Sequence, residues 1–485
     1  MSPLLVFSII AGYFGLLLLI ANITSKGSTS ETFFTANRQS PWYVVAFGMI
    51  GASLSGVTFI SVPGEVGNSN WSYFQIVLGY LVGYFVIATV LLPLYYRLNL
   101  VSIYQYLESR FGASSYKTGA FFFLISRVIG ASFRLFLVAG VLQIAFFDAF
   151  DVPFFVSVLV TIALIWLYTF QGGIKTIVWT DTLQTFFMLL AVVISIYFIA
   201  SDLDMGFSAV MATISDSPLS TTFIWDWKAP GNFYKQFFSG AFIAIVMTGL
   251  DQDMMQKNLT CRNLKDAQKN VFWFSTSLVF VNLLFLSLGV LLYHYATVQG
   301  IAMPGRSDNL YPLLAINEFH VAGGIVFLLG ITAAAYSSAD SALTALTTSF
   351  YVDFLNKDPQ KSESKSRMLI HLGFSVLILM VIMVFRAIND DSVIVAVFKV
   401  AGYTYGPLLG LYSFGLFTTR QIRDKYAPLV CVLSPLITYL LNENSEWLFG
   451  GYSFGFELLL VNGLLTFLGL LAISNGHQTT TGEEG

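Results

Sequence analysis

Hydroxyl and carboxylate groups are concentrated in one apolar segment, residues 333–341. Ser337, Ser338 and Ser341 lie within about one helical turn, with Asp340 between them, and residues three or four apart share one face of a helix. A hard cation such as sodium prefers several oxygen ligands and few formal charges when it is bound and released reversibly. The segment therefore predicts a cation site, although serines inside a helix also bond back to the preceding turn.

Several charged side chains fall inside long apolar segments. Asp181 lies near the start of one segment, and Arg127 and Arg134 lie seven residues apart, on one face, in another. Charged groups cost several kcal/mol in hydrocarbon unless they are paired or hydrated, so these must face the interior of a helix bundle. Arg127 could clamp a substrate carboxylate, or form a fixed ion pair with a loop or with Asp181. Lys399 is expected to extend its ammonium to the membrane surface.

Two apolar segments carry residues that interrupt a helix. Residues 51–56 (GASLSG) are followed by Thr58 and Pro63, which is poor helix chemistry. Irregular backbone at membrane depth persists only where it lines a cavity or packs within protein, so the run predicts an internal site, with a close-packed face of small residues as the alternative. Residues 248–253 (TGLDQD) form the second interruption, five helices further on. Such a pair is typical of inverted-repeat transporters.

The composition places most of the chain in lipid. Of its 485 residues, 56% are hydrophobic and only 11% are charged, with a mean hydropathy of +0.73, whereas a soluble globular protein carries about 25% charged residues. The formal net charge of −3 is too small to indicate a nucleic-acid partner. Cys261 and Cys431 are the only cysteines, so neither a disulfide framework nor redox chemistry is expected. The lipid bilayer is therefore the expected environment of the protein.

Apolar runs long enough to cross a hydrocarbon core of about 30 Å number about thirteen. They fall near residues 4–22, 42–66, 74–97, 117–147, 153–170, 175–201, 234–257, 269–297, 321–353, 367–388, 394–419, 425–442 and 453–474. The first run has no basic residue before it and no small-residue cleavage pattern after it, so we expect a retained helix and not a signal peptide. The predicted fold class is an all-α polytopic membrane protein.

Basic residues are unevenly distributed among the connecting segments. Alternate loops hold most of the 24 lysines and arginines, Lys257 among them, and cytoplasmic loops retain such residues. This places the N-terminus outside and the polar tail after Ser474 in the cytoplasm, in the plasma (bacterial inner) membrane. The longest connection, residues 202–233, carries Trp225 and Trp227, which are typical anchors at the membrane surface.

Six short motifs follow one another along the chain and are specific when taken together. They are Ser53–Phe59 (SLSGVTF) with Pro63-Gly64, Ser102–Phe111 (SIYQYLESRF), Gly172-Gly173 through Thr180-Asp181 and Gln184, Asp251-Gln252 with Gln256, Ser337-Ser338, and Gly402 through residues 406–410 (GPLLG). In these motifs the chain resembles the sodium:solute symporter family, which includes sodium/galactose, sodium/proline and bacterial sialic acid symporters. The resemblance implies a sodium-coupled symporter of a small polar solute, without enzymatic activity.

The resemblance also implies a LeuT-like core of two inverted five-helix repeats, with the binding site at their interface. One helix precedes this core and two helices follow it. On this basis the chain divides into 1–41 (first helix and cytoplasmic loop), 42–201 (first repeat), 202–233 (extracellular connection), 234–419 (second repeat), 420–474 (two C-terminal helices) and 475–485 (cytoplasmic tail).

Members of the family share a sodium site, made by two carbonyls at the first break and by a carbonyl and two hydroxyls of the eighth core helix. The matching positions in this sequence are Gly51, Leu54, Ala334, Ser337 and Ser338. The hydroxyl cluster inferred from spacing and the family's site therefore coincide, and Na⁺ is the ion that the resemblance implies.

Some members, including sialic acid symporters, have a second sodium site. The matching positions are Asp181, Ser338, Asp340 and Ser341. Asp340 stands where a hydroxyl is usual in the family. Two carboxylates could bind a second sodium more tightly, or one could hold a proton because close like charges raise one pKa, so the number of sodium ions is left open.

Substrate groups in the family come from the first break and from the second, third and sixth core helices. The corresponding residues are Ser53, Ser55, Thr58, Gln75, Arg127 and Asp251. Val77 stands where sugar and sialic acid carriers have Glu or Gln, which weakens a hexose assignment. Arg127 matches the position where sialic acid symporters bind the substrate carboxylate. An organic acid or acidic sugar such as sialic acid is therefore favoured over a neutral sugar or another polar metabolite.

Three other functions are weaker alternatives. A transporter-like solute sensor needs an output domain, and about a dozen polar residues follow Ser474. An intramembrane enzyme needs a catalytic constellation, and His294, His320, His371 and His477 have no metal-binding spacing. A channel is disfavoured because an interrupted inverted pair indicates alternating access. The oligomeric state is left open.

Overall fold

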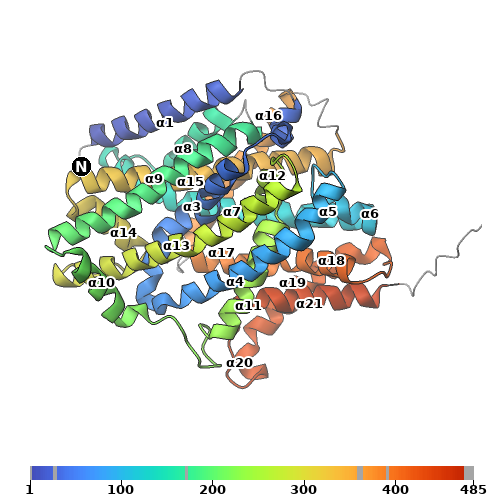
Figure 1. Ribbon diagram of the computed structural model, residues 1–485. Helices are drawn as coiled ribbons and strands as arrows, with labels where there is room; N and C mark the ends of the chain where they lie inside the picture. Colours follow the sequence, from blue (N-terminus) through green and yellow to red (C-terminus); the bar gives the residue numbers. More distant parts are fainter. Residues whose placement is uncertain (1–2, 26–29, 170–172, 358–363, 389–392, 475–485) are drawn as a thin grey trace, which may run out of the picture.

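The computed structural model describes residues 3–25, 30–169, 173–357, 364–388 and 393–474. Within these ranges the chain is almost entirely helical, and the only β-structure is two isolated bridges, Ser40 with Cys261 and Ile422 with Ser474. Most of the long helices run from one end of the molecule to the other, from left to right in Figure 1. The tail predicted at 475–485 lies outside the described residues.

The helices that build the bundle alternate with short helices in the connections. The bundle helices are α1 (Pro3–Ser25), α3 (Trp42–Ser69), α4 (Tyr73–Val86), α7 (Ala113–Ala145), α8 (Phe154–Thr169), α9 (Gly173–Asp202), α11 (Phe233–Ala244), α12 (Gln252–Asn258), α13 (Leu264–Val298), α15 (Val321–Ser349), α16 (Ser364–Ile388), α17 (Val393–Thr404), α18 (Gly406–Phe417), α19 (Ala427–Glu443) and α21 (Leu458–Ala472). The short helices are α2 (Ser30–Thr35), α5 (Leu92–Arg97), α6 (Gln105–Arg110), α10 (Phe207–Asp216), α14 (Leu310–Leu313) and α20 (Ser445–Leu448).

Every apolar run that the sequence predicts overlaps one or more of these helices. By length and composition, 8 helices of the described chain could cross a membrane, or 10 if each of two bent pairs is one span. One of the 8 extends from Trp42 to Arg97 and so covers two predicted runs, while α8 and α21 have only 16 and 15 residues. The multi-pass helical fold is confirmed, and the count of thirteen stays a prediction.

Both predicted interruptions are present as breaks in the backbone. In α3 the helix is broken at Ser55, whose φ of 50° and ψ of 178° are not helical; a positive φ is uncommon for a residue with a β-carbon. The second break separates α11 from α12, whose axes meet at 72°. A short π-helical turn, Ile245–Gly249, ends α11, and Asp251 then caps α12 by accepting hydrogen bonds from two of its backbone amides.

A third bend was not predicted as a break. Helices α17 and α18 meet at 47°, within a run that the sequence suggested was one continuous helix. Gly406 and Pro407 form the first turn of α18, and proline cannot supply the amide that would continue the hydrogen-bond ladder from α17. The bend brings Tyr405 toward the bundle interior, where its hydroxyl donates to Asp251.

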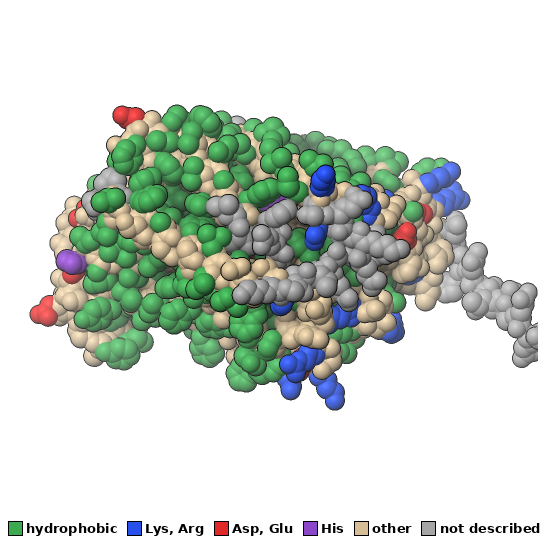
Figure 2. Space-filling model, turned by 90° about the horizontal axis from the view of Figure 1, so that it is seen from above, with side chains coloured by type: hydrophobic (Ala, Val, Ile, Leu, Met, Phe, Trp, Pro, Cys, Tyr) green, Lys and Arg blue, Asp and Glu red, His purple; other side chains and the backbone are tan. Residues whose placement is uncertain are grey.

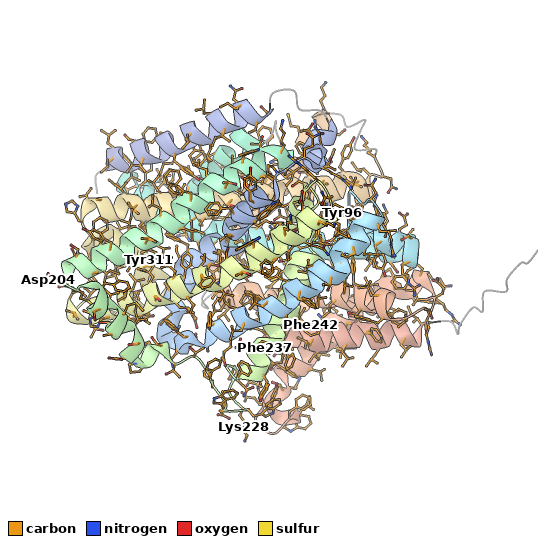
Figure 3. All side chains as sticks on the ribbon, in the orientation of Figure 1. Tyr96, Asp204, Lys228, Phe237, Phe242 and Tyr311 are labelled. Carbon is orange, nitrogen blue, oxygen red and sulfur yellow. The ribbon has the colours of Figure 1, made fainter. Side chains whose placement is uncertain are left out.

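Helix α3 occupies the middle of the bundle, where it packs against α9, α13 and α15 (Figure 1). Small residues let the neighbouring helices approach closely. A β-carbon at Gly79 of α4 would lie 2.0 Å from the Phe237 carbonyl oxygen of α11, and one at Gly240 would lie 2.1 Å from the Ile76 carbonyl oxygen. Figure 3 marks Phe237 on α11 at this crossing. The second broken helix is thus held against α4 by backbone contact.

Candidate functional site

A cavity lies at the break of α3. Its volume is about 70 Å³, which is room for several water molecules. Ser53, Ser55 and Thr58 line it from the break, and Arg127 and Arg134 line it from α7. Residues of α4, α11, α13 and α17 complete the walls. The structure therefore brings four of the six predicted substrate residues, and a second arginine, to one space.

An aromatic wall on α4 forms one side of the cavity. Tyr73, Tyr80 and Tyr84 all line it; the hydroxyls of Tyr73 and Tyr80 are 3.3 Å apart, and the Tyr84 hydroxyl is 3.4 Å from that of Thr248. The Tyr73 ring stacks on Phe398 of α17 with centroids 6.4 Å apart. Sequence reasoning missed these tyrosines, although spacings of seven and four residues place them on one face of a helix.

Arg127 is held by two carboxylates from the second break. Its guanidinium forms an ion pair with Asp253 and lies 3.9 Å from an Asp251 carboxylate oxygen. The three side chains are almost completely buried. Of the two roles considered for Arg127, the structure shows an ion pair; its partners are Asp251, the non-helical cap of α12, and Asp253 in the first turn of α12, and do not include Asp181. Asp251 contacts Arg127 and Tyr405 and is not among the residues that line the cavity.

Arg134 differs from Arg127 in its lack of a counter-ion. Its side chain is buried, with 7% of the residue exposed. No carboxylate of the described residues is within ion-pair distance of its guanidinium, and its Nε and Nη1 atoms make no hydrogen bond there. The cavity therefore contains a guanidinium without a direct ion-pair partner among the described residues.

Asp181 of α9 is engaged at both carboxylate oxygens. Ser337 of α15 donates a hydrogen bond of 2.7 Å to Oδ1, and the Lys257 ammonium lies 2.7 Å from Oδ2. Lys257 was counted from the sequence with a basic cytoplasmic loop. In the structure it belongs to α12, and only 1% of its side chain is exposed. That interpretation of Lys257 is wrong, because the bend before α12 directs the ammonium into the bundle.

The positions expected for the shared sodium site lie on two helices in contact. The break of α3 carries Gly51 and Leu54, and a β-carbon added at Gly56 would be 3.8 Å from the Ala335 Cα of α15. The Ser338 hydroxyl is 3.4 Å from the Ala334 carbonyl of its own helix, a weak bond that leaves the hydroxyl available. Gly51 also fixes α3 to α9, since its amide donates to the Thr185 hydroxyl at 3.0 Å.

The remaining predicted positions lie around this pair of helices. Asp340 accepts a hydrogen bond from the backbone amide of Ser341, whose hydroxyl donates to the Ser337 carbonyl at 2.9 Å.

Gln75 is placed differently from the other substrate residues. Its amide group bonds to the backbone of Ser72, Ile224 and Gly231, and it does not line the cavity. It ties the 202–233 connection to α4.

Comparison with known proteins places this geometry in a family. Residues 33–424 match the model of the Sodium:solute symporter family. Among curated relatives, the sodium/sialic acid symporter NanT of Aliivibrio fischeri is 24% identical over 86% of this chain and 83% of its own length, and SiaT of Proteus mirabilis is 24% identical over 85% of each. The human sodium/iodide cotransporter is 24% identical over 84% of this chain and 65% of its own length.

Solved structures agree on the fold. A Na⁺-coupled sialic acid symporter superposes with a TM-score of 0.81 at 19% identity, covering 96% of this chain and 97% of that one. A nucleobase-cation-symport-1 family transporter superposes with a TM-score of 0.57 at 14% identity, covering 91% and 93%. These proteins are transporters and not enzymes, and their fold is the LeuT-like one. With its two broken helices and its oxygen-rich centre, the chain belongs to the sodium:solute symporter family and is a sodium-coupled symporter.

Proposed function

We propose that this symporter carries a small solute with a carboxylate group, which Arg134 binds in the cavity at the break of α3. The observation that carries the proposal is the buried guanidinium of Arg134, which has no counter-ion among the described residues. A buried charge without a partner is costly. A substrate carboxylate would supply the missing partner and two hydrogen-bond acceptors in the planar geometry that arginine matches.

The neighbouring residues suit such a ligand. Ser53, Ser55 and Thr58 offer hydroxyls for its polar groups, and the tyrosines of α4 offer flat apolar faces. Arg127 stands two helical turns before Arg134 and remains a substrate residue in this proposal, although Asp253 and Asp251 already balance its charge. A neutral sugar, the alternative class, would leave the Arg134 guanidinium without a direct ion-pair partner.

For the ion, the proposed shared site comprises the Gly51 and Leu54 carbonyls, the Ala334 carbonyl and the hydroxyls of Ser337 and Ser338. Two observations support this site. The break of α3 contacts α15, and the donors are neutral oxygens, which sodium prefers as ligands from several directions. The same break carries Ser53 and Ser55 toward the substrate cavity. A sodium ion that orders the break would therefore favour the conformation that binds substrate. Occupancy of the sodium site would in this way raise the affinity for substrate.

One break lies in α3 and the other between α11 and α12. These are the first helices of the two proposed five-helix repeats, residues 42–201 and 234–419, and a pair of breaks so placed supports inverted repeats and alternating access. The proposed orientation has the N-terminus outside and the chain in the plasma (bacterial inner) membrane. Basic side chains gather over the right-hand half of the molecule in Figure 2, whereas the N-terminal end of α1 lies at the left in Figure 1. Retention of Lys and Arg on the cytoplasmic side favours this orientation.

Arg134→Gln is expected to weaken binding of the carboxylate substrate by roughly 30-fold or more, because loss of a buried charged partner costs about 2 kcal/mol or more. Arg134→Lys should recover only part of the affinity, since an ammonium lacks the planar fork. Thermal stabilisation of the purified protein measures this, using acids such as N-acetylneuraminate, lactate and pyruvate beside their uncharged esters or amides.

Arg386→Gln is the matched control, since Arg386 packs over Phe154 and does not line the cavity. Stabilisation by an ester or amide equal to that by its acid would contradict the proposal. So would an Arg134→Gln protein that binds the acid as tightly as the parent.

A further inference from the structure

The carboxylate of Asp181 has a cation beside it that belongs to the chain itself. The Lys257 ammonium lies 2.7 Å from one oxygen, and the Ser337 hydroxyl donates to the other at 2.7 Å. Only 1% of either charged side chain is exposed. One ammonium, one carboxylate and a serine hydroxyl thus form a compact, charge-balanced group between α9, α12 and α15.

The position of Lys257 follows from the second break. Helix α12 is only seven residues long, and it packs against α3, α9, α13 and α15. Its 72° bend from α11 turns it across the bundle, so that a residue near its end reaches Asp181. The Lys257 backbone is fixed as well, because its carbonyl accepts hydrogen bonds from the amide and the hydroxyl of Thr260.

A sodium ion and an ammonium group compete for the same kind of binding site. Both are compact monovalent cations that bind carboxylate and hydroxyl oxygens. A sodium ion at Asp181 would be within a few ångströms of the ammonium unless Lys257 moved away, and like charges at that separation repel strongly in a buried setting. Moving Lys257 away would leave a buried ammonium without its partner, which costs several kcal/mol.

We propose that Lys257 is a built-in cation that takes the place of a second sodium ion at Asp181, so that the protein binds a single sodium. This inference rests on the proposed shared site, which would hold that one ion at the α3 break. One donor otherwise expected around a second ion is engaged elsewhere: the Ser341 hydroxyl donates to the Ser337 carbonyl and lies 3.4 Å from an Asp253 oxygen. Transport of one sodium with one monocarboxylate would then move no net charge.

Sodium binding to the purified full-length protein tests the inference without any substrate. Sodium chloride is titrated with choline chloride at constant ionic strength, and the stoichiometry is measured by equilibrium binding of radioactive sodium. The parent should bind one sodium ion with a Hill coefficient of about one. Lys257→Met keeps the apolar stem but removes the charge, so Asp181 should accept sodium and the stoichiometry should rise to two.

Two further variants complete the test. Asp181→Asn combined with Lys257→Met removes both charges of the pair, so it should fold and bind one sodium even if Lys257→Met alone is too unstable to purify. Two sodium ions bound by the parent, or a folded Lys257→Met protein that still binds one, would overturn the built-in cation. Failure of the shared site is seen separately, as unchanged sodium affinity in Ser338→Ala.

Discussion

Replacing Asp253 by Asn is expected to abolish substrate binding and to destabilise the protein by about 3–5 kcal/mol, the usual cost of removing one partner of a buried ion pair. Asp253 pairs with Arg127 beside the cavity, and both side chains are at most 5% exposed. Without Asp253, the one carboxylate of the described residues that remains near the guanidinium is Asp251, at 3.9 Å. Asp251 is already committed to the Tyr405 hydroxyl and to two amides at the start of α12.

Thermal unfolding of the purified protein, read beside substrate binding, measures this effect. Asp204→Asn is the matched control, because Asp204 is exposed at the end of the molecule (Figure 3). Replacing both members, as Arg127→Met with Asp253→Asn, should recover part of the stability but not the binding, since the unpaired guanidinium is gone while the Asp251 carboxylate keeps its Tyr405 and backbone-amide donors. An Asp253→Asn protein as stable as the parent would contradict a structural role for the pair.

Ser338→Ala is expected to raise the half-saturating sodium concentration about tenfold while leaving the fold intact. The hydroxyl makes only a long bond of 3.4 Å within its own helix, so its removal costs little packing but deprives the ion of one ligand. Loss of such a polar contact is worth about 1–2 kcal/mol, which corresponds to roughly tenfold in affinity. The measurement is initial uptake as a function of sodium concentration.

Ser132→Ala provides the comparison for this variant, because Ser132 is a buried serine of α7 that bonds back to the Val128 carbonyl at 2.7 Å. It should leave the sodium dependence as it is. Equal sodium dependence in Ser338→Ala and the parent would exclude Ser338 as a ligand.

The features that the sequence predicts well are local ones. Glycine, serine and proline in an otherwise apolar run already indicate the break at residues 51–56, and the structure has it at Ser55. Serines three and four residues apart indicate a shared helix face before any partner helix is known. The helical membrane fold follows from composition, and the order of the six motifs identifies the family.

The features that the sequence does not predict depend on an angle between helices. Nothing in the composition of residues 248–258 specifies the 72° bend, and without the bend Lys257 reads as the first residue of a basic loop. The same bend sets Asp253 against Arg127, which lies several helices earlier in the chain. Gln75 shows the opposite error, because a polar residue in a matching position bonds to a nearby connection instead of lining the cavity.

Uptake into proteoliposomes tests sodium-coupled carriage of a carboxylate most directly. Labelled acids are offered under an inward sodium gradient, with potassium or choline gradients of equal ionic strength alongside. With the sodium gradient, and only then, an acid should accumulate inside the proteoliposomes above its outside concentration. A sodium ionophore that collapses the gradient should abolish this accumulation. The corresponding amide should be taken up very little. Accumulation that is equal without sodium, or that the uncharged amide matches, would contradict sodium-coupled carriage of a carboxylate.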